Sequence, residues 1–116
     1  TYSNTMKRKL LNVNETTLEQ HGAVSEQTVK EMAQGALATA NADLVIAVSG
    51  IAGPDGGSVE KPVGSVWIAW GTKEQLYSHY FCIKGNRTYF QKSVAARSLD
   101  LIRRLLIASA KKPLYF

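Results

Sequence analysis

The chain has 116 residues, of which 45% are hydrophobic, and this is enough for one domain with a single core. No apolar run is long enough to cross a bilayer, so we expect no membrane-spanning segment and no membrane partner. The net charge of +5 is spread over several predicted helices instead of one basic face interleaved with aromatic residues. We therefore expect no nucleic-acid partner, whereas a moderate positive charge suits an anionic small substrate.

Three helices are predicted in the first part of the chain, each preceded by a side chain that can accept hydrogen bonds from its first backbone N–H groups. They are residues 6–11 after Asn4 or Thr5, residues 15–20 after Asn14, and residues 26–40 after Ser25. Gly22 is expected to end the second helix, because glycine readily adopts the backbone conformation of a C-terminal cap.

Three strands and a last helix follow. The predicted strands are residues 43–48, 63–70 and 75–83, and the predicted helix is residues 87–108. The first strand is apolar without alternation, which is typical of a strand buried on both faces. The short turn at residues 71–74 predicts an antiparallel hairpin. This order predicts an α/β fold, with a mixed sheet flanked by helices, in a single domain of residues 1–116 whose last residues, 111–116, form a loose tail.

Cys82 is the single cysteine and lies in the third predicted strand. One cysteine cannot form an internal disulfide, so we expect a cytoplasmic location. A nucleophilic role is open to this thiol, but its place in a strand favours a buried structural role. His21 and His79 have no ligand partners at suitable spacing, so no metal site is predicted. Asp55 and Glu60 can form an acid–base pair, although solvated loop positions are favoured.

A glycine-rich segment, residues 49–57, joins the first two predicted strands. Glycine lets a backbone approach a ligand, and the carboxyl end of a buried strand is a common ligand site in α/β sheets. The segment is not a P-loop, because no Gly-Lys-Ser/Thr ends it, nor a dinucleotide fingerprint, because a strand follows it instead of a helix. Glycine content alone leaves two interpretations open: a ligand pocket, or a long hairpin connection that binds nothing.

Two cations are candidate functional residues. Lys7 lies one helical turn after Tyr2-Ser3-Asn4, and a partly desolvated lysine can act as the base for a hydroxyl nucleophile. The residues alone favour a surface lysine. Arg87 stands at the predicted start of the last helix, where free backbone N–H groups and a guanidinium can bind phosphate or carboxylate. A surface arginine beside Asn86 is equally consistent with the sequence.

Several stretches together resemble the CinA C-terminal domain family, from Tyr2 to about Leu106. The stretches that carry the resemblance are Tyr2-Ser3-Asn4 with Lys7 and Leu10-Leu11-Asn12-Val13, Leu18-Glu19-Gln20-His21-Gly22-Ala23-Val24-Ser25-Glu26, Val48-Ser49-Gly50-Ile51-Ala52-Gly53-Pro54-Asp55-Gly56-Gly57 followed by Glu60-Lys61-Pro62-Val63-Gly64, and Gly85-Asn86-Arg87. The third stretch is long and specific for the family.

The resemblance implies a three-layer α/β/α sandwich that assembles as a homodimer or a larger homo-oligomer. It also implies hydrolysis of the carboxamide of nicotinamide mononucleotide (NMN), which yields nicotinic acid mononucleotide and ammonia in pyridine nucleotide salvage. No metal or other cofactor is expected. The small-molecule substrate is a pyridine mononucleotide, and the residues leave open whether NMN or another member of that class is used.

The resemblance further implies which residues form the site. In the family a serine is the nucleophile, assisted by a tyrosine and a lysine that correspond to Tyr2 and Lys7. The positions expected to bind substrate are Ser3, Asn4, Gly50, Ile51, Ala52, Gly53 and Arg87. Within this set, Arg87 is the candidate for contact with the phosphate.

This chain departs from the family pattern in two places. The nucleophilic serine of the family lies in an "ESCTGG"-like segment upstream of Thr1, so we expect that the first segment of the domain is missing from this chain. Asn86 stands where the family usually has Asp. Two hypotheses stay open: the full-length protein is an NMN amidohydrolase, or it is a catalytically inactive relative that binds nucleotides or partners.

Overall fold

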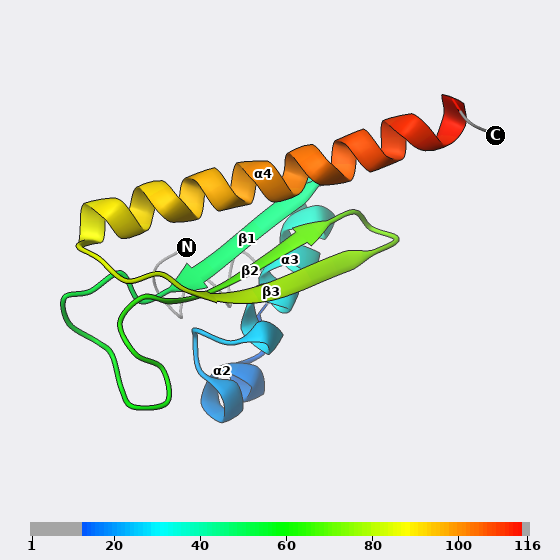
Figure 1. The fold of residues 1–116 in the computed structure, drawn as a ribbon. Helices are drawn as coiled ribbons and strands as arrows, with labels where there is room; N and C mark the ends of the chain where they lie inside the picture. The colour runs from blue at the N-terminus through cyan, green and yellow to red at the C-terminus, as the bar shows by residue number, and fades with distance from the viewer. Residues whose placement is uncertain (1–12, 115–116) are drawn as a thin grey trace.

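The computed structural model describes the backbone of residues 13–114 and the side chains of residues 13–108. The described elements are α2 (Glu15–His21), α3 (Glu26–Ala40), β1 (Val45–Gly50), β2 (Ser65–Gly71), β3 (Leu76–Cys82) and α4 (Arg87–Leu114) (Figure 1). The predicted types and order of these elements are confirmed. The helix predicted at residues 6–11 lies outside the described residues.

The three strands form one sheet in the order β1-β2-β3. The predicted hairpin between β2 and β3 is confirmed, and the Thr72 N–H donates to the Gln75 carbonyl at 2.9 Å in its turn. A mixed sheet was expected, but both pairings in the described part of the chain are antiparallel. The physical reason is the connection from β1 to β2, which turns directly back without the crossover helix that a parallel pair requires.

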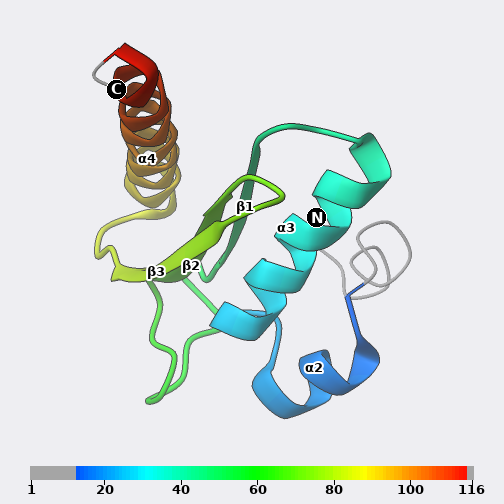
Figure 2. The same ribbon diagram turned by 90° about the vertical axis from the view of Figure 1, so that its right-hand side faces the viewer.

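Helices cover both faces of this sheet. Figure 2 shows α4 on one side and α3 on the other, with α2 beside α3. The fold is therefore the expected three-layer α/β/α sandwich. No helix in the described residues is both long enough and apolar enough to span a membrane.

Two hydrophobic cores fill the spaces between the layers, because alternate strand residues point to opposite faces. The core on the α3 side consists of Val13, Leu18, Val29, Met32, Ala33, Ala47 and Ala69. The core on the α4 side consists of Val66, Ile68, Ile83 and Phe90. The strand β1 lies between both helix layers, as predicted, with Ala47 and Ser49 buried and Val45, Ile46 and Val48 half-buried.

The predicted helix caps are confirmed. The Asn14 side chain accepts a hydrogen bond from the Thr16 N–H at 2.9 Å, and Ser25 Oγ accepts one from the Thr28 N–H at 3.2 Å. Gly22 ends α2 with φ of +80°, and its N–H donates to the Leu18 carbonyl at 3.0 Å. These contacts satisfy backbone groups that the helix ends would otherwise leave unpaired.

The prediction of a buried Cys82 is wrong, because the side chain is exposed. Cys82 shares the α3 face of β3 with Ser78 and Tyr80, and strand alternation was therefore no guide to its burial. The first residue of α3, Glu26, accepts a hydrogen bond from Ser78. The face beyond Ser78, where Tyr80 and Cys82 lie, extends past the start of α3 and is not covered by it.

The helix α4 also differs from its prediction. It continues to Leu114 instead of ending near Ala108, so residues 111–114, expected in a loose tail, are helical. Alanine and lysine are strong helix formers, and the segment after Ala108 contains both. Figure 1 shows the C-terminal end of α4 extending beyond the sheet.

Candidate functional site

The glycine-rich segment leaves the end of β1 and returns to β2 through a long connection, residues 51–64. Pairing continues past the strands: the Ile51 N–H donates to the Ser65 carbonyl at 2.8 Å, and the Gly64 N–H donates to the Ile51 carbonyl at 2.7 Å. A tight turn closes the tip, where the Ser58 N–H donates to the Lys61 carbonyl at 2.9 Å. The connection is thus a hairpin, as one of the two interpretations held.

A shallow, open hollow of about 590 Å³ lies along the same connection, lined by residues 54–59, Pro62 and Val63. Glycine lets the two arms of the connection come together. A Cβ on Gly57 would lie 2.6 Å from the Val63 backbone nitrogen, and a Cβ on Gly53, whose φ is +81°, would collide with the Val63 side chain. The hairpin connection is therefore confirmed, and a shallow, open hollow lies along it.

Arg87 lies at the start of α4, as predicted, and reaches the glycine-rich connection. Its Nη1 donates to the Gly53 carbonyl at 3.2 Å. Asn86 caps this helix, because its Oδ1 accepts from the Tyr89 N–H at 2.8 Å. An aspartate oxygen can make the same contact, which explains how Asn and Asp can exchange at this position. The structure thus brings Gly50, Ile51, Ala52, Gly53 and Arg87 to one end of the sheet.

Phe90, on the inner face of α4, packs against this end of the sheet, and the sequence analysis did not identify it. A Cβ on Gly50 would lie 3.0 Å from Phe90 Cζ and 2.9 Å from the Ser65 carbonyl oxygen. Only glycine at residue 50 allows α4 to pack this closely against the end of β1. The available signal was helical spacing, because Phe90 and Val94 lie one turn apart on the inner face of the helix.

Lys61 is a second residue that sequence reasoning missed. Its Nζ donates to the His21 carbonyl at 2.6 Å, and these two residues are separated by 40 positions in the sequence. This contact joins the tip of the glycine-rich connection to the end of α2. The second and third stretches of the family resemblance therefore lie against each other in space.

The structure describes only some of the other residues that the sequence analysis proposed for the site. Tyr2, Ser3, Asn4 and Lys7 lie outside the described residues. Asp55 and Glu60 are exposed, which confirms their prediction as loop positions open to solvent. No three His, Cys, Asp or Glu side chains among the described residues are grouped to hold a metal ion.

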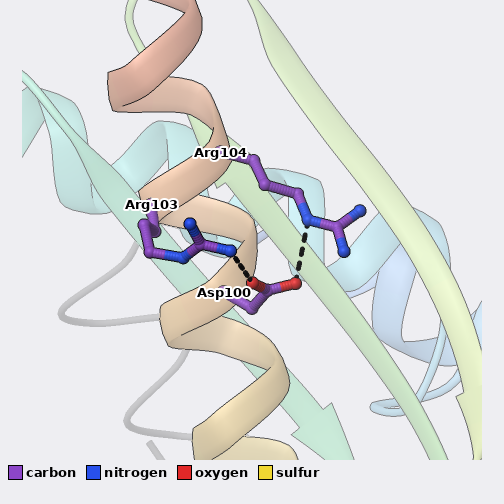
Figure 3. A network of polar contacts seen from close by, with 3 residues as sticks. All are labelled: Asp100, Arg103 and Arg104. Carbon is purple, nitrogen blue, oxygen red and sulfur yellow. Dashed lines mark hydrogen bonds and ion pairs between the residues drawn. The ribbon is translucent and has the colours of Figure 1, made fainter.

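Two carboxyl groups have lowered pKa values, and neither belongs to the glycine-rich connection. The Ser78 hydroxyl, with help from Lys30, lowers the pKa of Glu26. The hydrogen bond from Arg103, with help from Arg104, lowers the pKa of Asp100 on α4 (Figure 3). Both groups therefore favour the ionised form, which suits an ion pair better than a general acid.

Comparison with known proteins assigns the family. The family model of the CinA C-terminal domain matches residues 1–106. A CinA-like protein of Colwellia psychrerythraea is 53% identical over 104 residues, which make up 90% of this chain and 24% of that protein. The nicotinamide-nucleotide amidohydrolase PncC of Enterobacter agglomerans is 64% identical over 74 residues, 64% of this chain and 45% of that protein.

Further relatives agree. PncC of Escherichia coli strain K12 is 48% identical over 103 residues, 88% of this chain and 62% of that protein. The solved structure of competence/damage inducible protein CihA from Agrobacterium tumefaciens matches with a TM-score of 0.88 at 40% identity, over 90% of this chain and 65% of that one. This chain spans less than two thirds of the length of each of these proteins. The family model and the shared fold together show that the chain belongs to the CinA C-terminal domain family.

Proposed function

We propose that the full-length protein hydrolyses the carboxamide of NMN to a carboxylate and releases ammonia. The observation that carries this proposal is the 64% identity, over 74 residues, to a protein named nicotinamide-nucleotide amidohydrolase. The contact of Arg87 with the Gly53 carbonyl supports it, because this contact holds a guanidinium beside the glycine-rich connection, and a guanidinium suits a phosphorylated substrate.

The proposed reaction uses a serine that precedes this chain in the full-length protein. The serine oxygen attacks the carboxamide carbon while Lys7 or Tyr2 takes the serine proton, and backbone N–H groups stabilise the oxyanion that forms. The carbon–nitrogen bond then breaks, and the departing nitrogen takes the proton to leave as ammonia. Water attacks the resulting ester, which yields nicotinic acid mononucleotide and regenerates the serine.

The glycine-rich connection and Arg87 take the substrate-binding role in this proposal. Ser3, Asn4 and residues 50–53 contact the substrate where the connection leaves β1, and Arg87 contacts the phosphate. A guanidinium has five N–H donors, and the bond to Gly53 occupies one of them. Arg87 can therefore hold the connection and an anion at the same time.

Ammonia release from NMN by the full-length protein, including its upstream segment, tests the proposed activity. Lys7→Ala is expected to lower kcat at least 100-fold, because the serine loses its base. Lys9→Ala removes the same charge two residues away and is the matched control, with activity close to that of the parent. Activity that survives Lys7→Ala would contradict the catalytic role of Lys7.

The substrate-binding role has its own test. Arg87→Ala is expected to raise KM for NMN about tenfold, through loss of a charge-assisted contact, while kcat falls far less. Lys84→Ala, which removes a nearby exposed cation, serves as the control. An unchanged KM in Arg87→Ala would remove Arg87 from the binding site.

The inactive-relative hypothesis makes a different prediction, namely saturable binding of NMN to the full-length protein with no ammonia released. Isothermal titration of NMN beside the ammonia assay distinguishes the two hypotheses. A cytoplasmic location and assembly as a homo-oligomer belong to the same proposal. Intact mass and light scattering of the purified protein test the length of the chain and its assembly.

A further inference from the structure

A second hollow, far from the glycine-rich connection, lies between the middle of α4 and the sheet. Its volume is about 310 Å³, within the range of small-molecule sites. Trp70, His79 and Phe81 line it from β2 and β3. The helix supplies Arg97, Asp100, Leu101 and Arg104 to the opposite wall. Ten helical residues separate Arg87 from Arg97, which corresponds to about 15 Å along the helix axis.

Aromatic rings form the sheet wall of this hollow. His79 and Phe81 lie with their ring centroids 4.6 Å apart. Trp70 stacks on Tyr77 with a centroid separation of 5.7 Å and an interplanar angle of 25°. Trp70 and Phe81 are half-buried and His79 is exposed, so ring faces or edges border the hollow without filling it. Such a wall is suited to stacking against another planar ring.

Guanidinium groups form the helix wall. Arg97 lies over Phe81, with its Cζ 4.9 Å from the ring centroid, and has no carboxylate partner within the described part of the chain. Arg104 donates to Asp100 Oδ2 through Nε at 2.9 Å, so its two terminal nitrogens are turned away from Asp100 (Figure 3). A guanidinium held in this way can still bind an anion through its other N–H groups.

Asp100 positions this wall without cancelling its charge. One oxygen accepts from Arg103 at 2.8 Å and the other accepts from Arg104. One carboxylate among Arg97, Arg103 and Arg104 leaves the region positive. A cationic ligand is therefore disfavoured, and a neutral apolar ligand would leave the Arg97 guanidinium without an anion.

We propose that this hollow binds a small aromatic anion, a planar ring carrying a phosphate or carboxylate group. The ring packs against Trp70 and His79, and the acidic group binds Arg97 and Arg104. The volume accommodates one ligand of nucleotide size. This site is separate from the proposed hydrolytic site, and the inference does not depend on NMN hydrolysis.

Tryptophan fluorescence of the full-length protein gives a local test, because Trp70 lines the hollow. Trp67 lies on the opposite face of the sheet, where its ring contacts Tyr80. Comparison of the Trp67→Phe and Trp70→Phe variants therefore isolates the signal of Trp70. Titration of AMP is expected to change this fluorescence with saturation. Adenosine, which lacks the phosphate, and ribose 5-phosphate, which lacks the ring, are each expected to bind at least tenfold more weakly.

Arginine substitutions in the Trp67→Phe background locate the anion contact. Arg104→Gln and Arg97→Gln are each expected to weaken AMP binding about tenfold. Arg103→Gln is the matched control, because Arg103 shares Asp100 with Arg104 but does not line the hollow. Its AMP affinity is expected to stay within twofold of the parent. Equal weakening of AMP binding by Arg103→Gln and Arg104→Gln would overturn the proposal. The affinity would then depend on the net positive charge of the region and not on a contact between Arg104 and the ligand.

Two other results would overturn it. One is the absence of a saturable AMP signal from Trp70. The other is the same signal from Trp67 in a Trp70→Phe variant, which would place the ligand elsewhere. If Trp67→Phe lowers stability, fluorine NMR of the parent protein labelled with 5-fluorotryptophan replaces it. Only the Trp70 resonance is then expected to shift with AMP.

Ammonia release from NMN is expected to be unchanged in Arg104→Gln, which separates this site from the hydrolytic one.

Discussion

The two ends of the contact between α4 and the sheet differ in how they are filled. At the first turn, Phe90 is buried and meets Gly50, while Arg87 and Asn86 hold the backbone of the connection and the helix. Seven and fourteen residues after Phe90, the long side chains of Arg97 and Arg104 face the sheet, and a hollow remains between helix and sheet. One helix can therefore be anchored at one end and form a binding wall at the other, because the wall residues keep their charged heads in water.

The largest expected effect comes from Phe90→Ala at the closed end. Removing a buried ring leaves a cavity, so the free energy of unfolding should fall by about 3–4 kcal/mol. Tyr89→Ala is the matched control, because the neighbouring ring is exposed, and a loss below about 1 kcal/mol is expected. Denaturant unfolding of both variants measures the difference. Equal losses of stability would mean that the buried Phe90 ring anchors α4 no better than the exposed Tyr89 ring does.

Gly50→Ala tests the same contact from the strand side. The new methyl group would meet Ser65 O, Val66 Cβ and Phe90 Cζ at 2.9–3.0 Å. The helix or the strand must shift, at a cost of about 1–3 kcal/mol in stability. Thermal unfolding measures this cost. A stability equal to that of the parent would show that α4 does not rest closely on β1.

The cap of α4 is expected to contribute less. Asn86→Ala removes the acceptor of the Tyr89 N–H and should cost about 1 kcal/mol, whereas Asn86→Asp keeps an acceptor and should stay within about 0.5 kcal/mol of the parent. Denaturant midpoints compare the three proteins. If Asn86→Asp were as unstable as Asn86→Ala, the capping explanation for the exchange of Asn and Asp would fail.

The smallest effect concerns the open end and its dependence on pH. The pKa of Asp100 is lowered below 3.8 by the hydrogen bond from Arg103 first and by the charge of Arg104 second, and the residue is half-buried. A lowered folded pKa means that Asp100 contributes stability above pH 3.8, and this contribution is lost as the pH falls through the folded pKa. Carbon NMR titration should show Arg103→Gln raising the Asp100 pKa more than Arg104→Gln. The reverse order would contradict the assigned causes.

Local chemistry could be predicted from the sequence. Asn14, Ser25 and Gly22 act on backbone groups within a few residues of themselves, so their roles at the helix ends follow from the chain order alone. The glycine-rich connection and Arg87 were also correctly placed, because each follows directly from the end of a strand or the start of a helix. The proposed roles of Tyr2, Ser3, Asn4 and Lys7 stay predictions, since these residues lie outside the described part of the chain.

Only the tertiary structure decided which distant groups meet. Strand alternation gave the face of Cys82 but not its exposure, which depends on where α3 begins on that face. The contact of Lys61 with His21, the support of Gly50 by Phe90, and the hollow between Arg97 and Trp70 join segments far apart in the sequence. The sequence by itself determined the elements and their caps, because these depend on short-range hydrogen bonds and side-chain periodicity. The hollows depend on how the helix layers pack against the sheet, and this packing involves residues that are far apart in the sequence.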